Sequence, residues 1–527
     1  MKMKKQILFF MLSLLSVDLA YAQYPNVMIS NTNSPEEVTI RINPKNTNQI
    51  VAGANIENVF HSNDAGVTWT SGILTDPVSG VWGDPVVFTD TTGDFYYSHL
   101  SNPSSGGSWV DRIVFTKSTD GGATWWGTGT YTGHNGLKVQ DKEGIVVNKV
   151  TNEIYVTWTQ FDAYGTTNPL DSSVILFSKS ADAGLTWSTP VRISKEAGNC
   201  VDSDSTMEGA IPMVGPAGEI YVVWTGPNGF SFNKSLDDGV TWLPHETYVT
   251  SMPGGWDYNI AGLQRCNGLP QALCDLTGGP NNGTIYINWT DQRNGSTDTD
   301  VWLIKSTDGG TTWSSPIRVN DDAPGRQQFL TWMDIDKANG NIYCVFYDRR
   351  NFTASSPQTD VYVARSVDGG TTFSNYKINQ TSFIPSPGVF FGDYIGISAV
   401  NNIVRPIWMQ YGGSTLSVWT ALIDGTTLGI DESSLNAYSP VELKQNEPNP
   451  FNQSTWIKFA LKKSAKVDLC VYDVLGHKVA TLYNNEQFNE GEYDYIFNAS
   501  TYNLKAGVYY YSLACDEYKV TKKMIVY

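Results

Sequence analysis

"KSTDGGTTWS", residues 305–314, recurs with small changes at five other places in the chain. Every copy contains Ser-x-Asp-x-Gly-x-Thr followed by Trp or Phe, and the six aspartates are Asp64, Asp120, Asp182, Asp237, Asp308 and Asp368. Such an aspartate accepts hydrogen bonds from the amides of its own turn, the glycine permits a positive φ, and the aromatic ring returns to the core. Because each residue has a local role, the repeat predicts six structural turns rather than six active sites.

Short β-rich segments flank every copy of this box. "DVWLIKS" (residues 300–306) precedes one box, "SPIRVN" (residues 315–320) follows it, and two more strands with a polar turn recur upstream, as in "MDIDKANGNIYCVFYD" (residues 333–348). Four antiparallel strands that repeat every 55 to 71 residues are typical of propeller blades. We predict an all-β propeller of seven blades, with six as the alternative. The segment at residues 24–32 is expected to complete the last blade and remove its exposed edge.

The first 22 residues have the pattern of a secretory signal peptide, with lysines, an apolar run and small residues before a cleavage point after Ala22. The apolar run is too short to span a bilayer, and no later stretch is long enough. The net charge of −17 argues against nucleic acid as a partner, because phosphate backbones would be repelled. The sequence therefore predicts an exported protein without a transmembrane segment.

Cysteine and histidine show no metal-binding pattern. The six cysteines lack Cys-x-x-Cys or Cys/His spacing, and the five histidines are scattered. We therefore expect no cofactor, with calcium as the alternative because carboxylates gather in one register of the repeat. Export permits disulfides, and Cys266 and Cys274 lie close enough in the sequence to pair.

The sequence divides into a signal peptide (1–22), a propeller (23–424), a polar linker (425–440) and a C-terminal domain (441–527). The last segment alternates in strand fashion, which predicts a small Ig-like β-sandwich. Its five segments, from "NEPNPFNQSTWIKFAL" to the final "KKMIVY", resemble in order the C-terminal sorting domain of the type IX secretion system. The resemblance implies the secretion machinery as a partner and a protein that is secreted or anchored at the outer cell surface.

The boxes resemble the Asp-boxes, or BNR repeats, of sialidases and other secreted propellers. This resemblance implies a sialidase-like propeller that acts on glycans or glycoproteins, with glycoside hydrolysis as its activity. A non-catalytic propeller for glycan or protein binding, or for adhesion, is the alternative, because one fold hosts many functions. Sialidases use three arginines, a Tyr–Glu pair and an Asp. Here "RINP" at Arg41 departs from their first arginine motif, and no Glu partner is identifiable for Tyr394.

A propeller gathers the starts of its inner strands around one channel mouth, on the face opposite the boxes. Our alignment places a ring of seven residues there: Glu37, Asp84, Glu143, Glu208, Gln271, Thr331 and Asp393. Crowded carboxylates raise one another's pKa values, which suits acid–base chemistry, although each can instead accept hydrogen bonds from backbone amides. The predicted catalytic residues are Asp393, Tyr394, Glu143 and Glu208.

Two arginines in long loops are expected to bind substrate at the same mouth. Arg293 and Arg350 occupy matching positions in "WTDQRNGSTDTDVW" and "YDRRNFTASSPQTDVY". Their planar guanidinium groups can hold the carboxylate of a sialic or uronic acid. Alternatively, each arginine pins its own loop through the neighbouring Asp291 or Asp348.

The longest connection, "PGGWDYNIAGLQRCNGLP" at residues 253–270, also reaches this face. Extra loop length at a propeller mouth favours a role in binding. Trp256 and Tyr258 can stack on a sugar ring, and its hydroxyl groups can be oriented by three polar residues, Asp257, Arg265 and Asn267. The predicted pocket combines this connection with both loop arginines, Asp393 and Tyr394.

Overall fold

The computed structural model describes residues 24–413, 415–429, 441–473, 476–515 and 518–527. The predicted signal peptide and most of the predicted linker lie outside these residues. The chain divides into two units, Met1–Leu428 and Gly429–Tyr527, which are treated separately. Both are built from β-strands, and no helix among the described residues has the length and apolar character needed to cross a membrane.

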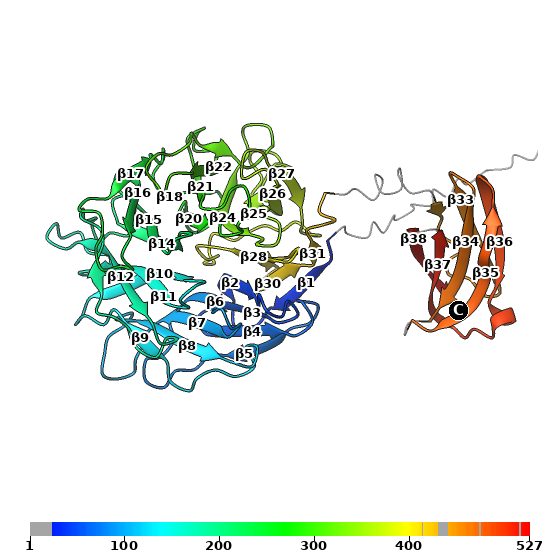
Figure 1. The fold of residues 1–527 in the computed structure, drawn as a ribbon, viewed down its shortest axis with the longest axis horizontal. Helices are drawn as coiled ribbons and strands as arrows, with labels where there is room; N and C mark the ends of the chain where they lie inside the picture. Colours follow the sequence, from blue (N-terminus) through cyan, green and yellow to red (C-terminus); the bar gives the residue numbers. More distant parts are fainter. Residues whose placement is uncertain (1–23, 414, 430–440, 474–475, 516–517) are drawn as a thin grey trace, which may run out of the picture. The chain divides into compact units, whose positions relative to one another are not determined.

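The first unit is a β-propeller, a ring of antiparallel sheets around a central channel (Figure 1). Seven sheets of four or five strands belong to it in the described part of the chain. The first three contain β2 (Glu36–Ile42), β3 (Ile50–Asn55), β4 (Asn58–Ser62) and β5 (Thr70–Ile73); β6 (Gly83–Thr89), β7 (Phe95–Leu100), β8 (Ile113–Ser118) and β9 (Thr130–Thr132); and β10 (Val139–Val147), β11 (Ile154–Phe161), β12 (Ser173–Ser180) and β13 (Val191–Arg192).

The next three sheets repeat this arrangement, with the inner strand named first. They contain β14 (Glu208–Val214), β15 (Ile220–Gly226), β16 (Gly229–Ser235) and β17 (Thr247–Thr250); β20 (Gln271–Cys274), β21 (Ile285–Asp291), β22 (Asp300–Ser306) and β23 (Ile317–Arg318); and β24 (Gln328–Ile335), β25 (Ile342–Asp348), β26 (Asp360–Ser366) and β27 (Ser374–Lys377). The long connection between β17 and β20 forms a small hairpin of its own, β18 (Asp257–Tyr258) and β19 (Cys266–Asn267).

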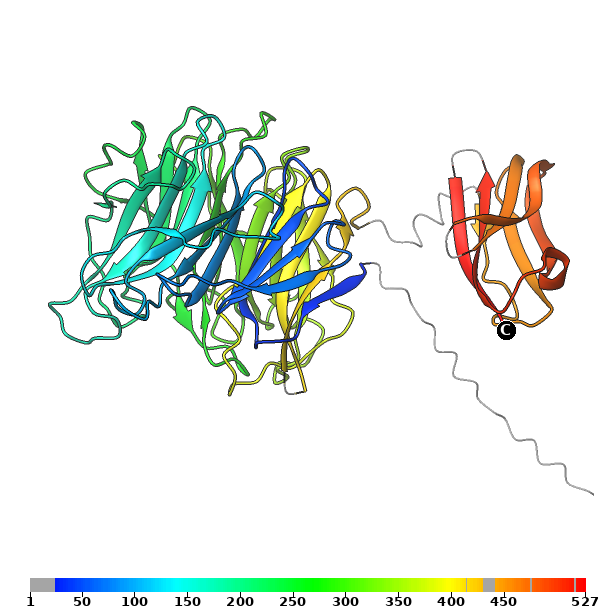
Figure 2. The same ribbon diagram turned by 90° about the horizontal axis from the view of Figure 1, so that it is seen from below.

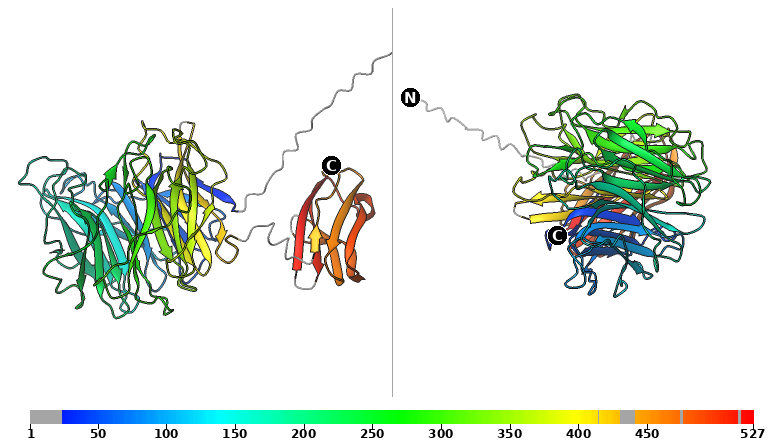
Figure 3. Two further views of the ribbon diagram at one scale, coloured as in Figure 1. Left: turned by 90° about the horizontal axis from the view of Figure 1, so that it is seen from above. Right: turned by 90° about the vertical axis from the view of Figure 1, so that its left-hand side faces the viewer.

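The seventh sheet joins the two ends of the ring. It contains β28 (Gly396–Val400), β29 (Ile403–Gly412), β30 (Thr415–Ala421), the short β31 (Ile423–Asp424) and the N-terminal strand β1 (Asn26–Ser30). Strand β1 pairs antiparallel with β30, with Asn26 opposite Ala421, and the dark blue strand lies beside the yellow ones in Figures 2 and 3. The predicted closure by the N-terminal segment is therefore confirmed, and it covers an edge that would otherwise be exposed.

Large aromatic side chains from the second strand of four sheets fill the space between neighbouring sheets. These fully buried residues are Trp158, Trp224, Trp289 and Trp408. Each of them lies on the second strand of its sheet, next to the inner strand. An equivalent position of the repeat therefore places a side chain of the same size in the core of each of these four sheets. Rigid aromatic packing of this kind fixes the relative orientation of adjacent sheets.

The boxes form tight turns at the outer ends of the third strands. In one copy, Ser306 Oγ donates to Asp308 Oδ1 at 2.8 Å and accepts from the Gly310 amide at 2.9 Å. The Thr312 amide donates to Asp308 Oδ1 at 2.9 Å. With the hydroxyl of Thr312, these bonds lower the pKa of Asp308 to about 2. Ser306 is buried, whereas Thr312 is exposed, so losing the bonds to Thr312 costs less than leaving a buried donor unpaired.

The second unit is a small β-sandwich. One sheet contains β32 (Val441–Leu443), β33 (Ser454–Leu461) and β36 (Gly491–Asn498), and the other contains β34 (Ala465–Tyr472), β35 (Lys478–Phe488), β37 (Gly507–Cys515) and β38 (Tyr518–Val526). A short 3-10 helix, η1 (Ala499–Tyr502), follows β36. Alternating side chains from both sheets, including Ile457, Phe459, Leu469 and Leu513, form one buried core.

Cys266 and Cys274, which lie close enough in the sequence to pair, are both free thiols. Cys266 lies buried in β19 and packs in the core near the closing sheet, whereas Cys274 ends β20 and packs against the core between the fourth and fifth sheets. Proximity in sequence did not bring the two side chains together because the connection folds back as a hairpin.

Candidate functional site

Five inner strands begin with the same irregularity at the channel mouth. A β-bulge separates Glu36 from Thr39, and equivalent bulges interrupt β6, β10, β14 and β24. Each bulge holds a residue in the left-handed region: Glu37 (φ 51), Asp84 (φ 50), Lys142 (φ 51), Gly209 (φ 65) and Leu330 (φ 49). Such conformations are costly for residues other than glycine, and they gather at functional sites.

The bulges shift the ring of residues that we had predicted. Lys142 occupies the bulge position in β10, and Glu143 is its neighbour; in the same way Glu208 precedes Gly209, and Thr331 follows Leu330. An alignment by strict alternation misses the extra residue that a bulge inserts. The ring at the mouth therefore contains a lysine that the sequence pattern did not indicate.

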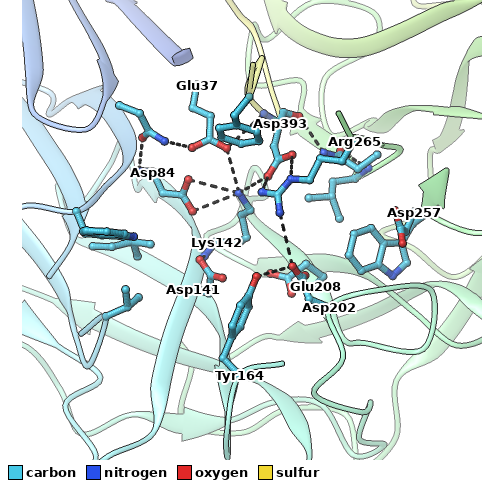
Figure 4. A pocket seen from close by; sticks show the side chains of 18 of the residues that line it. Glu37, Asp84, Asp141, Lys142, Tyr164, Asp202, Glu208, Asp257, Arg265 and Asp393 are labelled. Atoms are coloured by element: carbon cyan, nitrogen blue, oxygen red, sulfur yellow. Dashed lines mark hydrogen bonds and ion pairs between the residues drawn. The ribbon is translucent and has the colours of Figure 1, made fainter. Parts of the chain in front are cut away.

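Lys142 lies at the centre of three carboxylates (Figure 4). Its Nζ atom is 3.0 Å from Asp393 Oδ2, 3.3 Å from Asp84 Oδ2 and 3.6 Å from Glu37 Oε1. Burial by itself lowers the pKa of Lys142, but these carboxylates together hold it well above its usual value. The ammonium group thus occupies the place where a cation would neutralise the ring. Among the described residues, no group of three or more His, Cys, Asp or Glu side chains is arranged to hold a metal ion.

Asp393 is shared between Lys142 and Arg265. The Nε atom of Arg265 donates to Asp393 Oδ1 at 2.9 Å, and its Nη2 group donates to Oδ2. The amide of Asn267 donates to the main-chain oxygen of Asp393 at 3.0 Å, so the hairpin β18–β19 is tied to the start of the seventh sheet. Burial opposes ionisation of Asp393, yet the two cations lower its pKa to about 2.

Glu208 is a buried carboxyl group with no hydrogen-bond partner at either oxygen among the described residues. Burial, followed by the charges of Asp141 and Asp202, raises its pKa well above the usual range. Glu143 behaves in a similar way, since burial raises its pKa to about 8 although Ser98 donates a hydrogen bond to it. The mouth therefore holds ionised and protonated carboxyl groups together, an arrangement that divides acid and base roles between them.

Three partly exposed aromatic side chains form a wall beside these carboxyl groups. Trp82 and Trp109 meet edge to face at 5.8 Å, and Trp109 meets Tyr164 at 5.9 Å. Each of the three is between 37% and 41% exposed. The Tyr164 hydroxyl donates to Asp202 Oδ2 at 2.6 Å, and Arg265 Nη1 lies 3.8 Å from the same oxygen. This aromatic wall gives the pocket an apolar side next to a polar one.

The pocket at the mouth has a volume of about 180 Å³, and eight of the residues that the sequence analysis placed there line it. These residues are Glu37, Asp84, Glu208, Trp256, Asp257, Arg265, Asn267 and Asp393. Two others, Glu143 and Tyr394, line an adjoining pocket that shares Asp84, Lys142 and Asp393 with the first one. Tyr394 Oη lies 3.4 Å from Asp84 Oδ1, and Lys142 stands over its ring at 5.4 Å.

Arg293 and Arg350 do not line either mouth pocket. Arg293 donates to Asp291 Oδ1 at 2.9 Å through Nε and stacks over Trp302 at 4.6 Å. Arg350 contacts Asp348 Oδ2 at 2.8 Å, and Asp321 and Asn375 hold its remaining nitrogens. A carboxylate two residues earlier in the chain pairs with each guanidinium, as in the loop-pinning alternative.

Two predicted stacking residues are also turned inward. Tyr258 is buried, and its hydroxyl donates to the main-chain oxygen of Asn267 at 2.9 Å. Trp256 touches the pocket but is buried with the core between the fourth and fifth sheets. Both side chains therefore shape the long connection rather than present an open face to a ligand.

The sequence analysis missed Lys142, Asp202 and the whole aromatic wall. These residues stand on bulges and on loops that differ from sheet to sheet, so no repeated position marks them. A weak signal was present, because Trp82 and Trp109 each come two residues before an aspartate in the Gly- and Ser-rich stretches "SGVWGD" and "GGSWVD". Trp82, Trp109 and Tyr164 contact one another in turn, and a contiguous exposed apolar group of this kind is typical of a binding site.

Comparison with known proteins gives a family for the C-terminal segment. Residues 448–527 match the family described as "Secretion system C-terminal sorting domain". The chain is 23% identical to a sialidase of Bacteroides fragilis over 292 residues, which cover 49% of this chain and 47% of the relative. It thus spans about half the length of the curated relative that it matches.

Several solved structures are similar in outline. The Hadza microbial sialidase Hz136 has a TM-score of 0.42 and 15% identity, covering 71% of this chain and 73% of its own. A polysaccharide lyase of family PL25, an ulvan lyase, has a TM-score of 0.46 and 12% identity, covering 76% and 96%. The α-L-arabinanase of Penicillium chrysogenum has a TM-score of 0.41 and 13% identity, covering 76% and 97%.

The ring of sheets and the repeated boxes define the class of the first unit, a sialidase-like β-propeller. The second unit carries a sorting domain of the type IX secretion system. The protein is accordingly exported through that system, to the cell surface or to the outside.

Proposed function

We propose that this protein is an exported glycan-acting propeller and that its mouth pocket hydrolyses a glycosidic bond. The observation that carries the proposal is the aromatic wall of Trp82, Trp109 and Tyr164 facing carboxyl groups whose pKa values differ. An apolar wall binds the face of a sugar ring, and carboxyl groups in two protonation states provide an acid and a base. The sialidase of Bacteroides fragilis to which the chain is similar supports a reaction of this class.

Glu208 is the proposed general acid. Burial, followed by the charges of Asp141 and Asp202, raises the pKa of this carboxyl group well above its usual range and so favours the protonated form, and no donor among the described residues occupies its two buried oxygens. Figure 4 shows it beside Asp202 in the same part of the pocket. In the proposed reaction Glu208 gives its proton to the glycosidic oxygen as the bond to the anomeric carbon breaks.

The Tyr164–Asp202 pair is the proposed nucleophile and base. Tyr164 Oη already donates its proton toward Asp202 at 2.6 Å, so attack of the phenol oxygen on the anomeric carbon transfers that proton to the carboxylate. Water then displaces the tyrosine, with Glu208 now accepting a proton and Asp202 returning one to the phenol oxygen. A tyrosine nucleophile is also what sialidases use. Tyr394, the tyrosine proposed from the sequence, lies in the adjoining pocket beside Asp84.

The charge of the pocket favours a sugar without a carboxylate. Its lining contains two cations, Lys142 and Arg265, and both contact Asp393. It also contains seven acidic residues, Glu37, Asp84, Asp141, Asp202, Glu208, Asp257 and Asp393. Even with the most strongly shifted groups protonated, an anionic sugar would enter a region of net negative charge without an available cation. We therefore propose a neutral or amino sugar as the substrate, rather than the sialic or uronic acid suggested by the loop arginines.

The proposal is tested with chromogenic glycosides of neutral and amino sugars and the Glu208→Gln variant of the full chain. Loss of a general acid is expected to lower kcat/KM by roughly 10²- to 10⁴-fold while sugar binding persists. Glu196→Gln, at an exposed site outside the pocket, is the matched control and should retain the wild-type rate. Equal activity in Glu208→Gln and the control would contradict the assigned role.

A non-catalytic binding propeller is the second candidate function. The exposed faces of Trp82 and Trp109 favour it, because an aromatic wall alone suffices to bind sugar without any chemistry. In that case oligosaccharides bind to the wild type, no product forms, and Glu208→Gln binds as well as the wild type does.

A further inference from the structure

A second set of charged residues lines the central channel far from the mouth pocket. The channel has a volume of about 200 Å³ and is bounded by the inner strands, among them β2, β10 and β24. Arg41 stands near the end of β2, Lys149 follows β10, and Lys337 follows β24. Inner strands begin at the mouth and end at the box face, so these three cations converge at the opposite end of the channel from Lys142.

Among the described residues, a single carboxylate, that of Asp334, pairs with this group. Arg41 Nη1 lies 3.5 Å from Asp334 Oδ2, and Arg41 Nε is buried without a hydrogen-bond partner among the described residues. Asp334 is already engaged, since its Oδ2 accepts from the Ala399 amide and its Oδ1 from the Ile335 amide, both at 2.9 Å. No carboxylate in the described part of the chain lies within ion-pair distance of the nitrogen of Lys149 or Lys337.

The three cations oppose one another. Burial and the charges of Lys337 and Arg41 lower the pKa of Lys149 to about 6, and Asp334 only partly compensates. Desolvation of the amine and the charge of Arg41 also lower the pKa of Lys337, although the residue as a whole is exposed. Arg41 and Lys149 are half-buried, so the repulsion within this group is relieved either by loss of the Lys149 proton or by an anion that binds among the three side chains.

We propose that Arg41, Lys149 and Lys337 form a binding site for a doubly charged oxyanion, sulfate or phosphate, at the box end of the channel. The guanidinium offers a planar fork, and Lys149 and Lys337, whose side-chain nitrogens lie next to each other, supply point charges beside it. The negative pocket at the mouth repels such an anion, so the two ends of one channel select ligands of different charge. This site does not depend on the reaction proposed at the mouth.

Binding at this site is coupled to a proton. The groups that face Lys149 are Lys337, Arg41 and Asp334, and together with burial they leave Lys149 largely neutral at pH 7.5. An oxyanion favours the charged form and raises the pKa of Lys149, so binding takes up a proton. Sulfate does not titrate between pH 5.5 and 7.5, and its affinity should therefore rise as the pH falls through about 6.

The test is calorimetric titration of the full chain with sodium sulfate at constant ionic strength set by chloride. We expect at least tenfold tighter binding at pH 5.5 than at pH 7.5, with proton uptake visible as a dependence of the heat on the buffer. Lys149→Met and Lys337→Met should each weaken binding at least tenfold, whereas Lys195→Met, at an exposed site, should not. Parallel titrations with inorganic phosphate and with a monosaccharide 6-sulfate show whether the site binds a free oxyanion or a sulfate ester.

Thermal unfolding provides a second measurement that does not rely on heats. Removing one of the opposed cations should leave Tm unchanged or higher in sulfate-free buffer, so misfolding is not the expected result. Sulfate should raise Tm of the wild type and of Lys195→Met, by mass action, but not that of Lys149→Met. The proposal is overturned if sulfate stabilises no more than chloride does, or if both channel variants bind sulfate like the control.

Discussion

At the scale of single residues, Lys142 determines the electrostatics of the channel mouth. It is held in the left-handed region by a bulge, and it lies within 3.6 Å of the carboxylates of Asp393, Asp84 and Glu37. A buried charge of this kind does not have to increase stability, but removing it leaves its partners uncompensated. Lys142, together with Arg265, therefore allows acidic residues to stay crowded together at the mouth.

Lys142→Met should lower the free energy of unfolding at pH 7.5 by about 3–5 kcal/mol, the range for breaking a buried ion pair. The loss should be smaller at pH 4.5, where protonation of Glu37 relieves the repulsion, because burial and Asp84 hold its pKa well above the usual value. Urea denaturation at both pH values measures the difference. In the control, Lys138→Met removes a partly exposed pair with Asp162 and should cost no more than about 1 kcal/mol.

Glu143 should make stability depend on pH. Its folded pKa of about 8 lies above the ordinary value of 4.5, so the folded state binds more protons than the unfolded state between these values. This contribution to stability is full below pH 4.5 and is lost as the pH rises toward 8, with a slope of up to about 1.4 kcal/mol per pH unit.

Glu143→Gln keeps the shape of the side chain and removes its titration. In this variant the free energy of unfolding should fall less steeply between pH 5 and 8, by up to about 1.4 kcal/mol per pH unit. Urea denaturation across this pH range measures the change. An unchanged pH profile, matching that of the exposed-site variant Glu196→Gln, would show that the Glu143 carboxyl is ionised in the folded protein.

At the scale of elements, the closing strand β1 ties the ends of the ring together. Ile29 is only 6% exposed and packs in the core with residues of β29 and β30, whereas the adjacent Met28 is 46% exposed. Successive residues of a strand face opposite sides. Substituting Ile29 therefore tests the packing of its side chain, whereas substituting Met28 is a control that leaves the main-chain pairing of β1 in place. The buried member should carry the stability that closure provides.

Ile29→Ala should reduce the free energy of unfolding by about 2–5 kcal/mol, and Met28→Ala by less than about 0.5 kcal/mol. Thermal or chemical unfolding of the full chain measures both. If the two substitutions have equal effects, β1 does not contribute a packed edge to the seventh sheet.

The elements also show where sequence reasoning succeeds and where it stops. The boxes and the alternating strands predicted the sheets and the closing strand, because hydrogen bonds of a turn and the period of a strand are local properties. The register at the mouth could not be predicted, since a bulge adds one residue without a sequence signal and so placed Lys142 where Glu143 was expected. Arg293 and Arg350 pair with carboxylates of their own loops, and such pairing depends on side-chain direction, which spacing alone does not reveal.

At the scale of the whole molecule, the propeller carries different charges at the two ends of one channel. The mouth combines seven acidic residues with an aromatic wall, and the box end gathers Arg41, Lys149 and Lys337. The repeated turns that build the ring lie away from the mouth, so loops at the mouth can differ from sheet to sheet without disturbing the fold. Export through the sorting domain brings the mouth to the cell surface or outside the cell.

The central claim is that the mouth binds a sugar without a carboxylate against the wall of Trp82, Trp109 and Tyr164. The most direct measurement is the Kd of the full chain for neutral, amino and sialylated oligosaccharides, repeated with Trp109→Ala. Trp456→Ala is the matched control, because Trp456 is 42% exposed and Trp109 is 41% exposed, but Trp456 belongs to the second unit. Our account predicts binding of neutral or amino oligosaccharides that weakens at least tenfold in Trp109→Ala and is unchanged in the control. Tighter binding of the sialylated ligands, or equal affinities in the two tryptophan variants, would contradict it.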